Sequence, residues 1–176
     1  MKKLILCSAI LCTIALLQSC NNSNQQAETQ PEVALQPNDS LFVVNEGGYN
    51  FQIILPKDLM ISNTTRIVVN QSTGDLHIQL GEQFWIVASQ EKTDMNNFKT
   101  LMNEDMLFTN KVMEETQNSL LVQRVLPDGT TYDYNFRSFS DVDGKPYIFK
   151  TSEEGEFSIE SVKRMRHAIT SVREKV

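Results

Sequence analysis

The chain has 176 residues, of which 40% are hydrophobic and 22% charged, and its formal net charge at pH 7 is −6. This composition excludes a chain that is disordered or collagen-like throughout, and the length suits one domain with its own hydrophobic core. The acidic balance argues against non-specific binding to nucleic acid or to an anionic membrane, because both would repel the protein. We therefore expect no nucleic-acid partner.

The N-terminal segment has the order of features found in a bacterial export signal. Lys2 and Lys3 precede an uncharged, mostly apolar run of fourteen residues, Leu4–Leu17. The run is shorter than the roughly 20 residues of a membrane-spanning helix, but it suits the core of a signal peptide. It leads into the sequence LQSC at residues 17–20, which resembles the lipobox of bacterial lipoproteins. An ordinary secretory signal and an uncleaved anchor are the alternatives.

This resemblance implies that residues 1–19 are a signal peptide and that Cys20 becomes the lipid-bearing N-terminus. Cleavage would remove two of the 16 basic residues and none of the 22 acidic ones, changing the net charge from −6 to −8. Two or more acyl chains give lasting attachment, so the first expected partner is a lipid bilayer. Asn21, where an inner-membrane retention signal would have Asp, favours the outer membrane, facing the periplasm.

Cysteine usage limits the chemistry of the mature chain. Cys7 and Cys12 lie within the expected signal peptide, and Cys20 would be consumed by lipid. The mature protein would therefore have no intramolecular disulfide, no thiol nucleophile and no zinc site that uses cysteine.

Residues 20–40 are expected to form the lipidated N-terminus and a flexible tether. They contain two prolines, no aromatic residue, and mostly Asn, Gln and Ser after the cysteine. Such a composition buries too little apolar surface to offset the entropy of ordering. Near its end, Asp39-Ser40-Leu41 resembles a short O-glycan acceptor motif of exported proteins, which makes Ser40 a possible glycosylation site.

A single domain is expected over residues 41–176, beginning with strands. Apolar and polar residues alternate with a period of two at 49–55, which predicts a strand there. Further strands are predicted from apolar segments and the turn sequences between them, at 66–69, 76–80, 84–87, 111–115, 119–126, 130–139 and 145–151. Residues 84–87 are apolar on both faces, as expected for a central strand covered on both sides. In 130–139 one face should hold the aromatic residues and the other the polar ones: Tyr132, Tyr134 and Phe136 against Asp133, Asn135 and Arg137.

Two helices are predicted from a period near 3.6 and from their caps. Thr93 or Asp94 suits the N-cap of the first helix, whose apolar stripe is Met95, Phe98, Leu101, Met102 and Met106. Ser158 suits the N-cap of the last helix, with Phe157 and Val162 as a hydrophobic staple. Its apolar stripe is Ile159, Val162, Met165, Ile169 and Val172.

The order of these elements predicts an α+β fold with an antiparallel sheet and packed helices. The sequence LPKDL, the strand FWIVASQE before the first long helix, and Gly-Lys-Pro-Tyr before the last helix resemble the PsbP-like α/β/α sandwich. Bacterial DcrB-like lipoproteins share that sandwich. The resemblance covers about residues 41–175 and implies an accessory or binding module.

No catalytic, cofactor or metal site is expected from the motifs. His77 and His167 are isolated, without metal-ligand spacing, and are read as surface histidines. Asp141-x-Asp143-Gly144 lacks the other ligands of a calcium loop and is read as a hairpin turn. Neither a nucleophile elbow nor a phosphate-binding glycine loop is present. Carboxylates assembled in space from distant strands remain an alternative, since such a pair leaves no sequence signature.

Two further patterns each have two explanations. Met95, Met102 and Met106 suit core packing better than an adaptable ligand surface. A cluster of basic residues near the C-terminus suits the helix dipole better than a partner-facing surface: Lys163, Arg164, Arg166, His167, Arg173 and Lys175.

The leading functional hypothesis is a membrane-anchored, non-catalytic envelope lipoprotein that acts as an accessory module and binds another envelope protein. The alternative is a periplasmic carrier of a small apolar ligand, held between the sheet and the helices. An open cavity of a few hundred Å³ would favour the carrier, whereas a closed core would count against it.

Overall fold

The structure, a computed structural model, describes residues 35–61 and 64–174. The expected signal peptide, Cys20 and most of the tether lie outside the described residues. In chain order the elements are β1 (Asp39–Glu46), β2 (Tyr49–Pro56), α1 (Lys57–Met60), β3 (Thr65–Val69), β4 (Leu76–Leu80), β5 (Trp85–Ser89), α2 (Met95–Asn103), β6 (Thr109–Glu115), β7 (Ser119–Val125), β8 (Thr131–Val142), β9 (Lys145–Thr151) and α3 (Ile159–Thr170).

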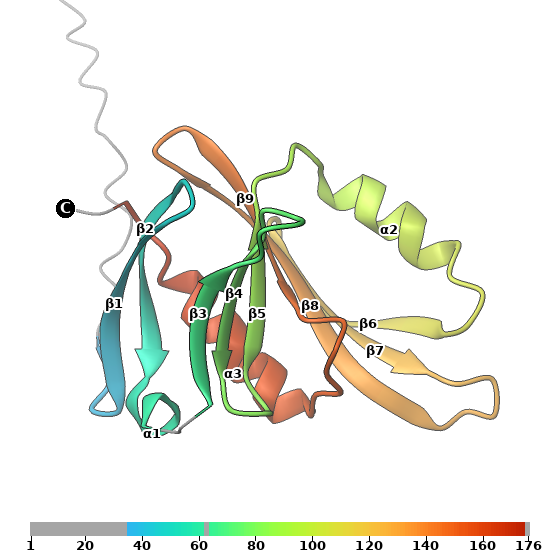
Figure 1. The fold of residues 1–176 in the computed structure, drawn as a ribbon. Helices are drawn as coiled ribbons and strands as arrows, with labels where there is room; N and C mark the ends of the chain where they lie inside the picture. The colour runs from blue at the N-terminus through green and yellow to red at the C-terminus, as the bar shows by residue number, and fades with distance from the viewer. Residues whose placement is uncertain (1–34, 62–63, 175–176) are drawn as a thin grey trace, which may run out of the picture. The chain divides into compact units, whose positions relative to one another are not determined.

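The strands form two antiparallel sheets (Figure 1). β1 and β2 make a hairpin, and the other seven strands form one sheet in the order β3-β4-β5-β9-β8-β7-β6. The expected α+β class with an antiparallel sheet is therefore confirmed. β1 begins at Asp39, two residues before the boundary expected between tether and domain.

The hydrophobic core lies between one face of the seven-stranded sheet, α3 and β2. Alternate residues of β2 enter it, with Phe51, Ile53 and Leu55 fully buried. The stripe of α3 faces the core as predicted, because Val162 and Met165 have no exposed surface and Ile169 only 4%. The Ser158 hydroxyl caps α3 by accepting the N–H of Ser161, and Phe157 is buried beside Val162 in the core.

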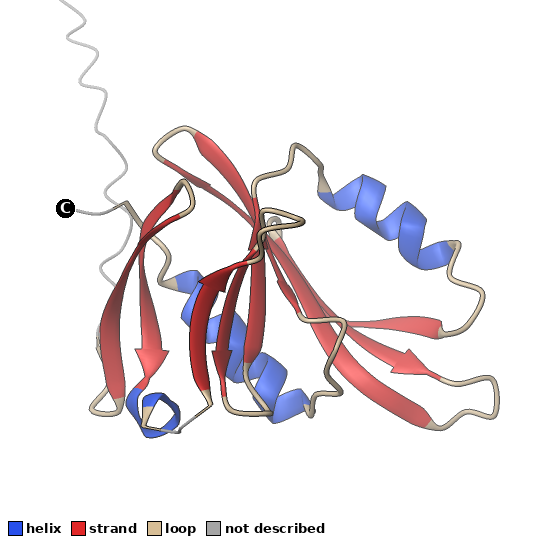
Figure 2. Cartoon of the chain, viewed as in Figure 1, coloured by secondary structure: helices blue, strands red, loops and turns tan. Residues whose placement is uncertain are grey.

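The opposite face of the sheet is covered only in part, by α2 (Figure 2). None of the residues of α2 is buried. The prediction that the methionines pack in the core is therefore wrong. α2 ends at Asn103, and Met106 lies beyond it with 96% of its surface exposed.

The turn between β8 and β9 requires two residues with positive φ. Asp143 and Gly144 join β8 to β9 with φ values of 55° and 69°, both in the left-handed region of a type I′ hairpin. Asp143-Gly144 is thus a turn, as predicted from the calcium-like motif. Within the described residues, no helix has the length and apolarity needed to cross a membrane.

Candidate functional site: a cleft beneath α2

A cleft of about 440 Å³ lies between α2 and the sheet. Three apolar residues of α2, Phe98, Leu101 and Met102, line one side of it. The other side is polar and charged, and its side chains come from β7, β8 and β9: Arg124, Asn135, Arg137 and Lys150. The volume falls in the range of small-molecule pockets, and the mixed lining suits a ligand with both polar and apolar parts.

Local contacts hold α2 above the sheet. The Asp94 carboxylate caps the helix by accepting the N–H of Asn97 at 2.9 Å. At the other end, the Asn110 amide of β6 donates to the carbonyl of Met102 at 3.0 Å. Lys99 pairs with Glu115 of β6. These contacts place Phe98, Leu101 and Met102 over the sheet without filling the space beneath them.

One end of the cleft is built around a bidentate ion pair. Arg124 of β7 donates from Nε and Nη2 to the two carboxylate oxygens of Asp133 on β8, at 2.7 and 2.6 Å. The Asp133 side chain is only 1% exposed, so the pair is largely shielded from water. The hydrogen bond to Asp133 raises the pKa of Arg124.

A β-bulge in β8 lies next to the Arg124–Asp133 pair. Arg124 pairs with Asp133 and Val125 with Thr131, so Tyr132 is the extra residue of a β-bulge. The Tyr132 ring stacks on Phe108 with centroids 4.9 Å apart, and the Arg124 guanidinium lies 5.2 Å from the Tyr132 centroid. The prediction that Tyr132 shares a face with Tyr134 and Phe136 is therefore wrong, because the bulge turns it toward Arg124.

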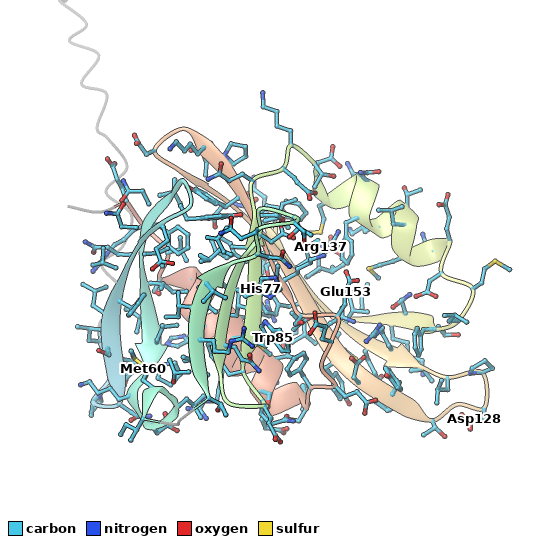
Figure 3. The ribbon with its side chains drawn as sticks, viewed as in Figure 1. Met60, His77, Trp85, Asp128, Arg137 and Glu153 are labelled. Carbon is cyan, nitrogen blue, oxygen red and sulfur yellow. The ribbon has the colours of Figure 1, made fainter. Side chains whose placement is uncertain are left out.

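Arg137 differs from Arg124 in having no acidic partner. Its guanidinium carbon lies 4.0 Å from the centroid of the Phe98 ring, and its Nε is buried without a hydrogen-bond partner in the described residues. Figure 3 shows it near Glu153, which lies in the turn after β9 and also lines the cleft. Burial lowers the pKa of Arg137, although an arginine keeps its charge at neutral pH. A buried unsatisfied donor costs about 1–3 kcal/mol, so this arrangement is unfavourable unless something pairs with it.

The acidic residues of the cleft already have partners. Asp105 accepts the backbone N–H groups of Leu107 and Phe108 and the Asn110 amide, so its pKa is lowered although burial alone would raise it. Glu153 pairs with Lys150 at 2.9 Å, and that hydrogen bond lowers its pKa. Both carboxylates are therefore ionised at neutral pH, which does not suit a general acid.

Three basic side chains of α3 form ion pairs with acidic residues of the same domain. Arg166 and Lys163 reach Glu114 of β6 at 2.6 and 3.5 Å. Arg164 donates to both carboxylate oxygens of Asp58 on α1 at 2.9 Å. A hollow of about 390 Å³ lies beside Arg166 and Glu114, but these charged groups pair with each other. This part of the cluster ties α3 to α1 and β6.

The histidines lie apart from the cleft. The Nδ1 atom of His77 accepts the indole N–H of Trp85 at 3.1 Å, and Figure 3 shows the two side chains together on the sheet. His167 is exposed on α3. Among the described residues, no three His, Cys, Asp or Glu side chains form a group that could hold a metal ion.

Ser40 lies in β1, where it pairs with Leu55 and is partly buried. It is therefore part of a strand rather than of an extended tether. Its glycosylation stays a prediction, as does lipid attachment at Cys20, which lies outside the described residues.

Sequence reasoning placed Asp133, Asn135 and Arg137 on one face of a strand but did not identify the cleft. The sequence feature that could have pointed to the cleft was the polar face of this strand. The pairing of Arg124 with Asp133 depends on the register between β7 and β8, which the residue pattern alone does not reveal. Comparison with protein-family models, curated proteins and solved structures found no match to the chain.

Proposed function

We propose that this protein is a non-catalytic binding module of the bacterial envelope that holds a small ligand in the cleft beneath α2. The observation that carries the proposal is the contrast between the two faces of the sheet. The α3 side is a packed core, and the hollow of about 390 Å³ at its margin is lined by charged groups that pair with each other. The α2 side keeps a cleft of about 440 Å³ that contains an arginine without an acidic partner among the described residues. The cleft is partly polar, so we replace the purely apolar ligand of the sequence hypothesis with one that has polar and apolar parts.

The remaining parts of the proposal rest on the sequence. Lipid on Cys20 would anchor the module to the outer membrane, facing the periplasm, and the residues between Cys20 and β1 would act as a flexible tether. The PsbP-like or DcrB-like sandwich is the finer fold that we propose. The support for it is that α2 and α3 contact opposite faces of one antiparallel sheet.

A cleft-filling variant tests the ligand proposal. Asn135 lines the cleft, and Asn135→Trp should occupy the ligand's space. Gln79→Trp on β4 adds the same ring to the same sheet face outside the cleft and is the matched control. Full-length proteins are purified from envelopes in mild detergent, and bound small molecules are extracted and identified by mass spectrometry. A compound enriched in the wild type and in Gln79→Trp but absent from Asn135→Trp is expected. Equal extracts from all three would contradict the proposal.

A protein partner is a second candidate function, favoured by the free edge of the sheet. β6 is the end strand of the seven, and Val112 and Met113 on it are 47% and 46% exposed. An exposed, partly apolar edge can pair with an extended segment of another chain.

Photo-crosslinking in intact cells tests this second candidate. A crosslinker replaces Met113, and the control replaces Val68 on the opposite edge strand, β3, which is 42% exposed. One reproducible protein adduct at position 113, absent at position 68, is expected. The edge-binding candidate is wrong if both positions give the same adducts.

A further inference from the structure

One cationic side chain that lines the cleft forms no ion pair with another described residue. Arg124 pairs with Asp133, Lys150 pairs with Glu153, and Asp105 is held by backbone N–H groups and Asn110. Among the described residues that line the cleft, Arg137 is therefore the cationic side chain without an acidic partner.

Within the described residues, the terminal Nη1 and Nη2 atoms of Arg137 form no hydrogen bond, whereas its Nε is buried. The guanidinium carbon lies over the Phe98 ring, 4.0 Å from its centroid, and this cation–π contact does not satisfy the N–H donors of Arg137. Glu153 and Glu91 both interact electrostatically with Arg137, but neither forms an ion pair with it, and Glu153 pairs with Lys150 at 2.9 Å. A guanidinium with a covered face and free edge donors matches the planar, two-oxygen geometry of a carboxylate.

We infer that the ligand of the cleft is an apolar monocarboxylate, with its carboxylate paired to Arg137 and its apolar body against Phe98, Leu101 and Met102. This inference rests on the proposed ligand-binding function and adds the chemical class. One unpaired guanidinium compensates one negative charge. A phosphate monoester would bring a second negative charge close to the carboxylates of Asp105 and Glu153, which also line the cleft.

Calorimetric titration of the full-length protein in detergent tests the inference with three probes that share one apolar body. The probes are naphthoate, naphthyl phosphate and the neutral naphthylmethanol, and each titration is corrected with detergent alone. Naphthoate should bind at least tenfold more tightly than either other probe, because a hydrogen bond to a charged group contributes about tenfold or more to affinity.

Three variants assign the effect to Arg137. Arg137→Met keeps the length and apolar character of the side chain and should weaken naphthoate binding at least tenfold. Arg137→Lys keeps the charge but loses the planar donors, so its affinity for naphthoate should lie between those of the wild type and Arg137→Met. Arg66→Met removes an exposed cation from the same sheet face outside the cleft and should bind naphthoate like the wild type. Circular dichroism of each variant shows whether it is folded.

The outcomes separate the inference from the function on which it rests. If naphthoate and naphthylmethanol bind equally and Arg137→Met changes neither affinity, the inference is wrong and the cleft binds neutral ligands. Tighter binding of naphthyl phosphate would also overturn it, in favour of phosphate esters. If none of the three probes binds the folded protein, both the inference and the proposed ligand-binding function are contradicted.

Discussion

The Arg137 guanidinium lies 4.0 Å from the Phe98 ring but forms no ion pair within the described residues. Four residues before it on the same strand, Asp133 holds Arg124 through two hydrogen bonds. One sheet face thus carries one arginine that is fixed by structure and one that is free to pair with a ligand.

This contrast predicts that the two arginines differ in their importance for stability. Arg124→Met leaves the Asp133 carboxylate, which is only 1% exposed, without its partner and should cost about 3–5 kcal/mol. Arg137→Met removes an unsatisfied buried donor, which favours folding, but it also loses the cation–π contact with Phe98. Because these two effects oppose each other, its free energy of unfolding should change by no more than about 1 kcal/mol. Urea denaturation of both variants measures the difference. Equal losses of stability would show that Arg137 has a structural role.

The buried face of α3 gives a second prediction. Ile169 is 4% exposed, so Ile169→Asp buries an unpaired charge and should cost several kcal/mol or prevent folding. His167→Asp on the exposed side of the same helix is the control. Thermal melting followed by circular dichroism compares the two, and similar melting temperatures would mean that the buried face is assigned wrongly.

Arg166 contributes more than a favourable interaction with the helix dipole, which is the role that the sequence predicted for the basic cluster. Its side chain is 14% exposed, and it bonds to Glu114 and to the Ser119 hydroxyl. The helical period correctly located the apolar stripe, but it cannot show that β6 and β7 approach the other side of the helix. That contact depends on long-range pairing.

Lowering the pH should weaken the ion pairs that connect α3 to β6 and α1. The hydrogen bond from Arg166 lowers the pKa of Glu114, so the ionised carboxylate stabilises the folded state above its ordinary pKa of about 4.3. This stabilisation is lost as the pH falls through the lower pKa of the folded state. At Asp58, burial would raise the pKa, but hydrogen bonds from Arg164 and Asn38 outweigh it and lower the pKa, which adds to the trend.

Melting temperatures between pH 7 and pH 3 check this pH dependence. The wild type should lose stability below about pH 5, and Glu114→Gln should lose less because it has no carboxylate to protonate. Glu46→Gln changes an exposed residue of β1 that forms no ion pair within the described residues, so it should follow the wild type. A Glu114→Gln curve parallel to the wild-type curve would contradict the role of this ion pair.

Cys20 tests the anchor directly. Cys20→Ala removes the sulfur that would receive the lipid, so metabolic labelling with palmitate should disappear and the unprocessed precursor should accumulate. Cys12→Ala, within the expected signal peptide, should label normally. Unchanged labelling of Cys20→Ala would end the lipoprotein hypothesis.

Sequence patterns located most elements of this fold because their signals are local. The caps at Asp94 and Ser158 and the alternation in β2 depend on neighbouring residues alone. The errors came from features that depend on tertiary structure: the bulge at Tyr132 and the open space beneath α2. An amphipathic stripe shows which side of a helix faces a sheet, but not how closely the two approach.

Amide NMR of the isotope-labelled, full-length protein during addition of naphthoate is the most direct test of ligand binding in the cleft. The account predicts saturable shifts centred on Phe98, Asn135 and Arg137, with little change at Arg166 in the hollow beside α3. The absence of saturable shifts, or shifts confined to the α3 hollow, would contradict it.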